Sequence, residues 1–215
     1  MSLQIERFVT GSYKQNCYIV ANDDGEALVI DPGSDAEGIF AIVEKNDWQP
    51  LAVIGTHAHF DHVGAVADVM DRYKISFYLN RADQKLLRRM NLFKMAIDSG
   101  FALRVPDITY DLAKLPASIL IGGIRLVVIA TPGHTPGGMS FLIEGNVFTG
   151  DTVLPKGTGR TDLPGGDPVA LLLSIEKLRG LSSTLVAYPG HGSSMPLGVL
   201  LDVAIKRETS RAMRK

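Results

Sequence analysis

The sequence predicts an α/β protein built as a layered sandwich. Strand-like and helix-like segments alternate in both halves of the 215-residue chain, of which 46% is hydrophobic. Clusters of strands with helices interspersed favour sheets packed on each other, with helices covering the outside. A chain of this length and composition can bury one sizeable core, so we expect a single domain over residues 1–215.

The first half opens with three short strand-like segments that are separated by turn residues. The sequence DDG at 23–25, between the second and third segments, is a hairpin signal. In the helix that follows, Ile39, Ile42 and Val43 have helical spacing. The predicted order is strands at 3–11, 16–23 and 26–33, a helix at 35–48, a strand at 51–59, a helix at 63–73, a strand at 75–79 and a helical stretch at about 81–100.

The second half returns to strands and then alternates a helix, a strand and a closing helix. Asp167 and Pro168 mark the start of the first of these helices, because Asp is a preferred N-cap residue and Pro a preferred first residue. The predicted order is strands at 124–133, 138–145 and 146–151, a helix at 168–181, a strand at 184–192 and a helix at about 197–211.

Charge and cysteine content argue against several functional classes. The net charge is −1 and no block of like charges occurs, so nucleic acid and anionic membrane surfaces are not expected partners. The single cysteine, Cys17, lies in the apolar run NCYIV, which favours a buried strand thiol and allows no internal disulfide. Glu6 and Arg7 precede any apolar segment of the kind found in signal peptides, and the longest apolar run, at 119–130, is too short to cross a bilayer. We therefore expect a soluble, cytoplasmic protein.

Histidines are unevenly distributed in this chain. Three of the five lie in the segment THAHFDH at 56–62, which could be a polar surface loop, a capping cluster at a helix start or a metal site. The other two, His134 and His191, each stand in a PGH sequence at the end of a predicted strand. Asp151 follows a fourth strand, in TGDT. Because four strand ends each deliver a potential ligand into a Gly- or Pro-containing turn, a metal site is the favoured interpretation.

The spacing of these residues divides them into two incomplete coordination shells. His57 and His59 are two residues apart, so in an extended segment they project to one side and can share an ion. Asp61 and His62 are adjacent and reach a second ion only where the chain turns into a helix; helix capping is the alternative role for Asp61. The predicted shells are His57, His59 and His134 around one ion, and Asp61, His62 and His191 around the other, with Asp151 bridging. Such ligands suit zinc, iron or manganese and leave room for water, as in a catalytic site.

These residues give the chain a family resemblance. The motif HAHFDH, followed by His134, Asp151 in TGDT and His191 in PGHG, resembles the ligand set of the metallo-β-lactamase-fold hydrolases, in order. Within that superfamily the chain resembles the glyoxalase II-like enzymes, from NCYIV to PGHG. The resemblance implies a four-layer αββα sandwich with a dinuclear site, most often zinc, at one edge.

The resemblance also implies a mechanism, in which a metal-bound hydroxide attacks an ester-type carbonyl. Only two carboxylates, Asp61 and Asp151, would face two divalent ions, and the excess positive charge lowers the pKa of bound water and stabilises the developing oxyanion. We expect a dinuclear hydrolase that cleaves a small-molecule thioester or ester. The sequence does not determine the oligomeric state.

The segment GTGRTDLPGGD, at 157–167, gives an indication of the substrate through the same family resemblance. In the glyoxalase II enzymes that the chain resembles, a lysine at the position of Arg160 contacts a carboxylate of glutathione, and an arginine can do the same. Persulfide dioxygenases of the same superfamily carry a similar G-R-T-D segment, so an iron-dependent persulfide dioxygenase is the alternative function. A lactonase, or a non-catalytic metal-binding protein, is a further alternative.

Three departures from the glyoxalase II pattern weaken the expectation that glutathione is part of the substrate. Only 24 residues follow His191, too few for the C-terminal helical domain of that family. Two aromatic positions of its pattern are Asp162 and Ser193 here. The stretch at about 81–116 is also longer than expected, and we interpret it as a helical insertion.

The apolar residues of this insertion have the spacing of a core helix. They are Leu86, Leu87, Met90, Phe93 and Ile97. Met90, Phe93 and Met95 lie within six residues of one another, so a cap over the active site is a second interpretation.

Overall fold

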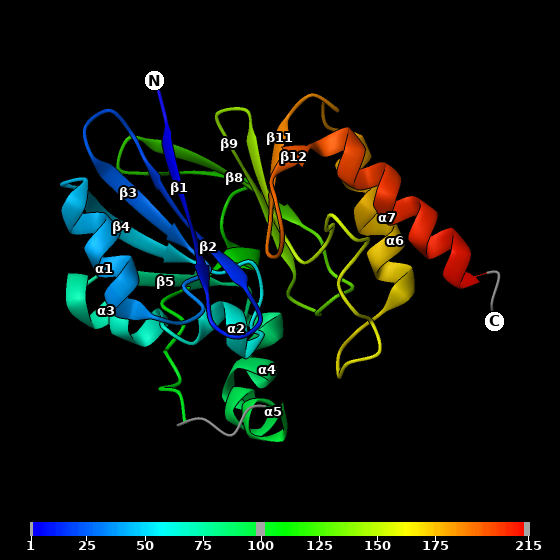
Figure 1. Ribbon diagram of the computed structural model, residues 1–215, viewed down its shortest axis with the longest axis horizontal. Helices are drawn as coiled ribbons and strands as arrows, with labels where there is room; N and C mark the ends of the chain where they lie inside the picture. The colour runs from blue at the N-terminus through cyan, green and yellow to red at the C-terminus, as the bar shows by residue number, and fades with distance from the viewer. Residues whose placement is uncertain (1, 98–101, 213–215) are drawn as a thin grey trace.

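The computed structural model describes residues 2–97 and 102–212 and contains two mixed, six-stranded sheets (Figure 1). The strands of the first sheet lie side by side in chain order, and those of the second lie in reverse order, from β12 to β7. The first sheet consists of β1 (Gln4–Thr10), β2 (Gln15–Ala21), β3 (Glu26–Ile30), β4 (Gln49–Ile54), β5 (Ser76–Leu79) and β6 (Tyr110–Asp111). The second consists of β7 (Ser118–Ile121), β8 (Ile124–Ala130), β9 (Met139–Ile143), β10 (Asn146–Gly150), β11 (Val186–Pro189) and β12 (Met195–Pro196).

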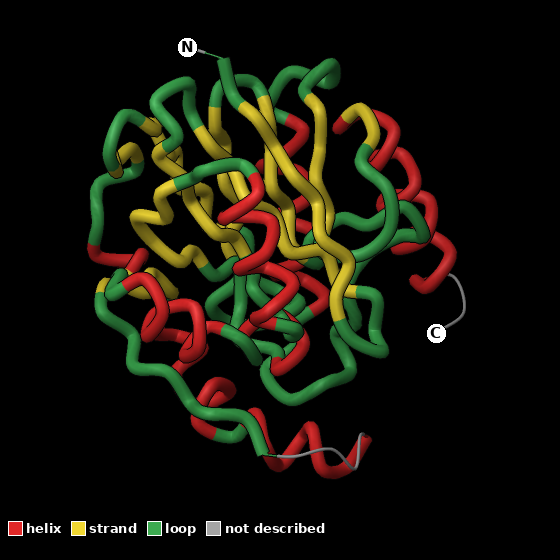
Figure 2. Tube along the Cα trace, turned by 60° about the vertical axis from the view of Figure 1, so that its left-hand side comes forward, coloured by secondary structure: helices red, strands yellow, loops and turns green. Residues whose placement is uncertain are grey.

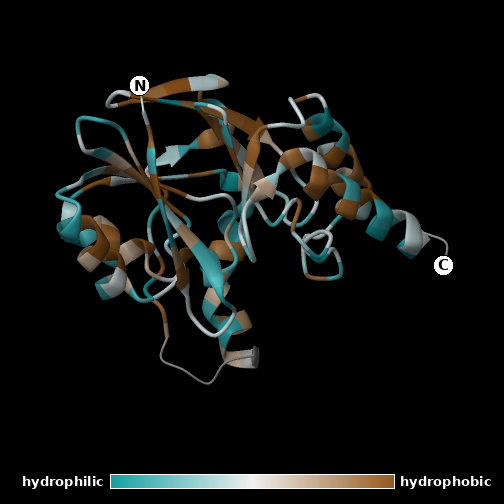
Figure 3. Ribbon diagram, turned by 45° about the horizontal axis from the view of Figure 1, so that its top comes forward, coloured by the Kyte–Doolittle hydropathy of each residue, from teal (hydrophilic) through white to brown (hydrophobic). Residues whose placement is uncertain are grey.

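Helices cover the outer face of each sheet, and Figure 2 shows the same arrangement from a second side. The first sheet is covered by α1 (Ala36–Lys45) and α3 (Val66–Tyr73), and the second by α6 (Pro168–Arg179) and α7 (Leu197–Ala212). Both apolar and polar residues lie along α6 and α7 (Figure 3), and Leu171, Ile175 and Leu178 of α6 are buried. The remaining helical segments are α2 (Phe60–Val63), η1 (Arg81–Asp83), α4 (Gln84–Arg88), α5 (Met90–Ile97) and η2 (Leu112–Lys114).

Three clusters of buried apolar residues fill the three spaces between these four layers. In β2, Cys17 and Ile19 face the helices α1 and α3, whereas Tyr18 and Val20 face the second sheet. This alternation follows from the two-residue period of a strand, and it means that β2 is buried on both faces. The third cluster packs β10 and β11 against α6 and α7. The predicted four-layer α/β sandwich is therefore confirmed.

Parallel strand pairs determine which loops meet at the edge of the sandwich. β3 pairs with β4 in parallel, and β10 pairs with β11 in parallel, so the carboxyl ends within each pair lie together. Asp31 follows β3, and Thr56 to His59 follow β4. Asp151 follows β10, and His191 follows β11. The two parallel pairs thus place the predicted ligand loops at a common edge.

The predicted helical stretch from about 81 to 100 is helical as far as Ile97 but is divided into three elements. The chain forms the 3-10 turn η1 and then two short helices, α4 and α5, with a break at Arg89, whose φ of −102° and ψ of 6° depart from helical values. Leu86, Leu87 and Met90 are buried, as a core helix requires. The residues at 98–101 lie outside the described part of the chain.

Three short strands escaped the sequence-based prediction. β6 and β12 have only two residues each, which is too short for an alternating pattern. β7 belongs to the apolar run at 119–130, where Gly122 forms the hairpin turn to β8 at a φ of +55°. The helix predicted at 63–73 is also divided, since α2 ends at Val63 and α3 begins at Val66.

No helix in the described ranges has both the length and the apolar character needed to cross a bilayer. Cys17 is fully buried in β2, as predicted, and burial raises the pKa of its thiol far above the usual range.

Candidate metal centre

The loops after β4, β8, β10 and β11 bring together all seven residues that the sequence singled out as metal ligands. The loop after β4 carries His57 and His59 in extended backbone and then enters α2, whose first turn carries Asp61 and His62. No capping hydrogen bond is made by a side chain at the start of α2, and the Asp61 carboxylate instead faces histidines.

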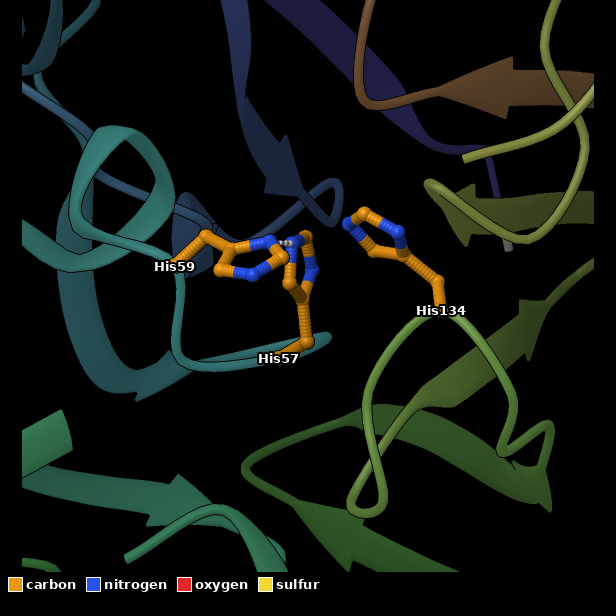
Figure 4. Close-up of side chains that lie close together, drawn as sticks. All are labelled: His57, His59 and His134. Carbon is orange, nitrogen blue, oxygen red and sulfur yellow. Dashed lines mark hydrogen bonds between the residues drawn. The ribbon is translucent and has the colours of Figure 1, made fainter. Parts of the chain in front are cut away.

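The first group consists of His57, His59 and His134, whose rings point toward one another (Figure 4). Their potential ligand atoms all lie within 4.8 Å of one another. The His57 Nε2 and His59 Nδ1 atoms are 3.1 Å apart, although the two residues are separated by only one position in the chain. Three imidazoles that converge in this way form one face of a site for a transition metal.

The second group consists of Asp61, His62 and His191, again with ligand atoms within 4.8 Å of one another. His191 Nε2 lies 3.4 Å from Asp61 Oδ2 and 3.4 Å from His62 Nε2. His62 comes from the first half of the chain and His191 from the second, so this group exists only where the two sheets meet.

Asp151 faces both groups. One carboxylate oxygen, Oδ1, lies 3.6 Å from His62 Nε2, and the other, Oδ2, lies 3.5 Å from His134 Nε2 and 3.6 Å from His191 Nε2. A side chain on Gly190 would collide with Asp151 Oδ1, so only glycine allows this approach of the turn after β11. Asp151 thus occupies the position that a bridging ligand requires, and bridging itself stays a prediction.

Unpaired polar atoms indicate that the residues suit metal ions. Among the described residues, His134 Nε2 and Asp151 Oδ1 are two of the few buried side-chain atoms that lack a hydrogen-bond partner. A buried polar atom without a partner is costly unless something satisfies it. Both atoms point into the centre, and imidazole and carboxylate are suitable ligands for zinc, iron and manganese.

In four of the five imidazoles, Nδ1 contacts an oxygen atom outside the two ligand groups, which leaves Nε2 directed to the centre. A hydrogen bond of this kind fixes the ring and its tautomer, as is usual for metal-binding histidines. The Nδ1 partners are Thr56 Oγ1 for His57 at 3.0 Å, Asp31 Oδ2 for His62 at 2.9 Å, the carbonyl oxygen of Arg160 for His134 at 2.7 Å and the carbonyl oxygen of Tyr13 for His191 at 3.1 Å.

Burial and neighbouring charges divide the histidines into two kinds. Burial lowers the pKa of His57 well below its usual value, and it lowers the pKa of His59 to about 3, with the other histidines adding to the effect. Burial also lowers the pKa of His62, but the carboxylates of Asp151 and Asp61 outweigh it and raise that pKa to about 9. Since the neutral imidazole is the form that binds a metal, His57 and His59 are ready for an ion, whereas His62 must release a proton.

Asp31 is a functional residue that the sequence analysis missed. Its carboxylate accepts hydrogen bonds from the backbone N–H and the hydroxyl of Thr56, at 2.7 and 2.6 Å, and also contacts His62 Nδ1. Because both its oxygens are already engaged, Asp31 positions ligands and is not one itself, although it lies close to His57 and His62. Its place after a strand, like that of Asp151, was the signal that could have found it.

Asp83, in η1, is a second residue that the sequence did not reveal. Its fully buried carboxylate accepts three hydrogen bonds, from the Ala58 N–H at 3.0 Å, the Thr135 hydroxyl at 2.8 Å and the Gly137 N–H at 2.6 Å. Ala58 lies between His57 and His59, and Thr135 follows His134. Asp83 therefore ties together the two loops that form the first group.

The turn that carries His191 is held by β2 of the opposite sheet. The Asn16 side chain donates to the carbonyl oxygens of Pro189 and Gly192, at 2.9 and 2.8 Å, and the Tyr18 hydroxyl donates to Pro189 at 2.7 Å. The run NCYIV thus supports the site as well as the core.

The groups open into a cavity of about 240 Å³ whose lining is mostly apolar. Asp61, Asp151 and three of the histidines are among its lining residues. The apolar lining residues include Phe60, Leu86, Phe93, Leu154 and Leu163. Arg160 also lines this cavity, but its guanidinium forms a two-point ion pair with Asp162, at 2.9 and 2.7 Å.

A four-layer αββα sandwich with a His and Asp cluster at one edge defines a class of metal-dependent hydrolases. The chain belongs to the metallo-beta-lactamase superfamily, whose family model matches residues 10–191. The superfamily and the cluster together indicate that the protein binds divalent metal ions.

The chain is similar over most of its length to one curated relative and to two solved structures. The hydroxyacylglutathione hydrolase GloC of Haemophilus influenzae is 31% identical over 207 residues, which span 91% of this chain and 94% of the relative. The crystal structure of the BLEG-1 B3 metallo-beta-lactamase superposes with a TM-score of 0.87 at 33% identity, over 94% of this chain and 98% of that chain. The structure of TTHA1623 in a di-iron-bound form gives a TM-score of 0.80 at 34% identity, over 90% and 96% of the two chains.

Proposed function

We propose that the protein is a dinuclear, zinc-dependent hydrolase that cleaves small-molecule thioesters or esters in the cytoplasm. The observation that carries the proposal is the position of Asp151, between two groups of three ligands and at the wall of a largely apolar cavity. The similarity to a hydroxyacylglutathione hydrolase supports the reaction class.

The roles of the residues follow from charge and placement. Two divalent ions in these groups would supply a hydroxide nucleophile at neutral pH and polarise the scissile carbonyl. Asp61 and Asp151 are the only carboxylates in the two groups and between them, so two divalent ions bound there would leave a net positive charge that favours a developing oxyanion. The apolar walls hold the organic part of the substrate and exclude water from it.

Turnover is expected to be independent of oxygen and to be restored by zinc alone. A persulfide dioxygenase, the alternative function, consumes oxygen and requires iron; the family resemblance implies that it would use only His57, His134 and Asp151 as ligands. The di-iron form of TTHA1623 makes this comparison necessary. The measurement is thioester and persulfide turnover by metal-free protein after addition of zinc or iron, with and without oxygen. Strict dependence on oxygen, with iron alone restoring activity, would favour the dioxygenase.

The substrate panel should extend beyond thioesters. Because BLEG-1 is described as a metallo-beta-lactamase, a β-lactam belongs in the panel, together with a lactone and S-lactoylglutathione. We expect small acyl thioesters to be hydrolysed well, with at most a modest preference for S-lactoylglutathione. Several contacts expected for glutathione are missing in this chain, so a glutathione leaving group gains little transition-state stabilisation from remote binding. High efficiency confined to the β-lactam would contradict the proposal.

Arg160→Ala is expected to lower kcat/KM for substrates that carry a carboxylate near the scissile bond and to leave uncharged substrates unaffected. The effect should be small, because Asp162 already engages both sides of the exposed guanidinium. Asp162→Ala is the matched variant: it frees the guanidinium and should increase the preference for the carboxylate substrate. Steady-state kinetics on a matched pair of charged and uncharged thioesters measures both. Equal effects on the two substrates would show that Arg160 is no anchor.

A further inference from the structure

A second cavity, of about 210 Å³, lies beside the cavity at the metal centre. Leu86, Phe93 and Pro164 line both, so the two spaces adjoin along a common apolar wall. Leu86 belongs to α4, Phe93 to α5 and Pro164 to the loop before α6. A substrate held at the metal centre that reaches past these three side chains would enter the second cavity.

Two cationic side chains line the second cavity. Lys85 lies in α4 and Arg89 ends it, and residues four positions apart lie on the same face of a helix. The other lining residues of this cavity are Ala82, Leu86, Phe93, Pro136, Pro164 and Gly165, none of which is acidic. The charged side chains that line the second cavity are therefore all cationic.

Neither cation is neutralised by a partner in the described structure. Within residues 2–97 and 102–212, the side chains of Lys85 and Arg89 make no hydrogen bond or ion pair, whereas the guanidinium of Arg160 in the first cavity is held by Asp162. Both side chains are exposed, so their donors remain available to a ligand. Exposed charges on a helix often do no more than contact solvent. Arg88 is such a residue here, because it is exposed on the same helix and lines neither cavity.

We propose that Lys85 and Arg89 form a subsite for an anionic group of the substrate, separated from the scissile carbonyl by an apolar segment. That the anion belongs to a hydrolysed substrate rests on the proposed function, whereas the binding of an anion at Lys85 and Arg89 does not. Its basis is the lining of the two adjoining cavities: Asp61 and Asp151 line the first, Lys85 and Arg89 line the second, and the apolar residues Leu86, Phe93 and Pro164 line both. A carboxylate or a phosphate ester has the required charge, and either could lie on the acyl or the thiol side.

Binding by the metal-loaded protein tests the subsite without reference to turnover. The probes are decanesulfonate and decanol, which share an apolar chain; a sulfonate is also a weak ligand for zinc. We expect calorimetry to show that the sulfonate binds about tenfold more tightly than the alcohol, since two partly exposed charge pairs are worth roughly that factor. The ratio should fall to about one in Lys85→Gln/Arg89→Gln.

A charge-matched control is available in Arg88→Gln/Lys114→Gln, which removes two exposed cations outside both cavities. This variant should keep the preference for the sulfonate. An equal preference in all three proteins, or an equal loss in both double variants, would overturn the subsite, because the attraction would then be a property of the net charge.

Kinetics then identify the source of the anion. One series carries an ω-carboxylate on acyl chains of increasing length, and a second carries a phosphate on the thiol, each with its uncharged ester as reference. An optimum at one chain length that disappears in Lys85→Gln/Arg89→Gln locates the anion in that series. Sulfonate binding without any thioester turnover would contradict the proposed function and leave the subsite standing. Thioester turnover without any charge preference would contradict the subsite alone.

Discussion

Asp151→Ala is expected to remove both metal ions and to lower hydrolytic activity at least about a hundredfold, since even the partners of metal ligands contribute 10–100-fold. The reason is geometric: the two carboxylate oxygens of Asp151 lie 3.5 to 3.6 Å from histidines of both groups. Losing it leaves three ligands in each group and two ions that repel each other without a shared anion. Metal content per protein chain, measured after purification without added metal, checks the result.

Asp61→Ala is the matched control for this prediction. Asp61 contacts only the second group, through His191 and His62 at 3.4 and 3.9 Å. Its loss should therefore lower the metal content by one ion, with the first group still occupied. If Asp151→Ala also lost only one ion, or none, Asp151 would not be the bridge.

Asp83→Ala is expected to lower the free energy of unfolding by roughly 2–5 kcal/mol, because three buried donors lose their acceptor at once. The donors belong to the loops of His57 and His134, so the same change should weaken metal binding by the first group. Urea unfolding of metal-free protein gives the first quantity, and metal titration gives the second.

Two further variants separate these effects. Asp83→Asn keeps the shape and one acceptor oxygen and should lie between wild type and alanine in both measurements. Asp71→Ala removes an exposed carboxylate that pairs with Arg104, and it should change neither measurement appreciably. A loss of stability in Asp83→Ala without any change in metal affinity would show that Asp83 supports the fold and not the site.

The sequence predicted the sandwich and the residues that cluster at its edge for related physical reasons. Strands such as β2 and β4 are continuous apolar runs because both faces of their sheet are covered, and such runs are easy to recognise. The histidines are informative because the chain has only five and all follow strands. Where a residue type is rare and follows the end of a strand, the local sequence pattern is enough to predict its place in the fold.

The remaining features depend on contacts between distant segments. Asp83 looks like any polar residue at the start of a helix, and its role arises only because Ala58 and Gly137 come to it in the fold. The division of the helical stretch at Arg89 is similar, since the apolar spacing continues through the break. The ion pair between Arg160 and Asp162 could not be predicted from the sequence either, because it depends on the side-chain conformations of both residues.

The division of ligands between the two halves of the chain has a consequence for cohesion. Sheet one is made by residues before 112 and sheet two by residues after 117, yet each ligand group draws on both. His62 and His191, whose rings face each other, are 129 positions apart. An ion held between them would act as a reversible cross-link closing a long loop, much as a disulfide does in proteins that have a second cysteine. Chelation would then remove this cross-link and lower the free energy of unfolding, although the apolar cluster between the sheets still packs the two halves together.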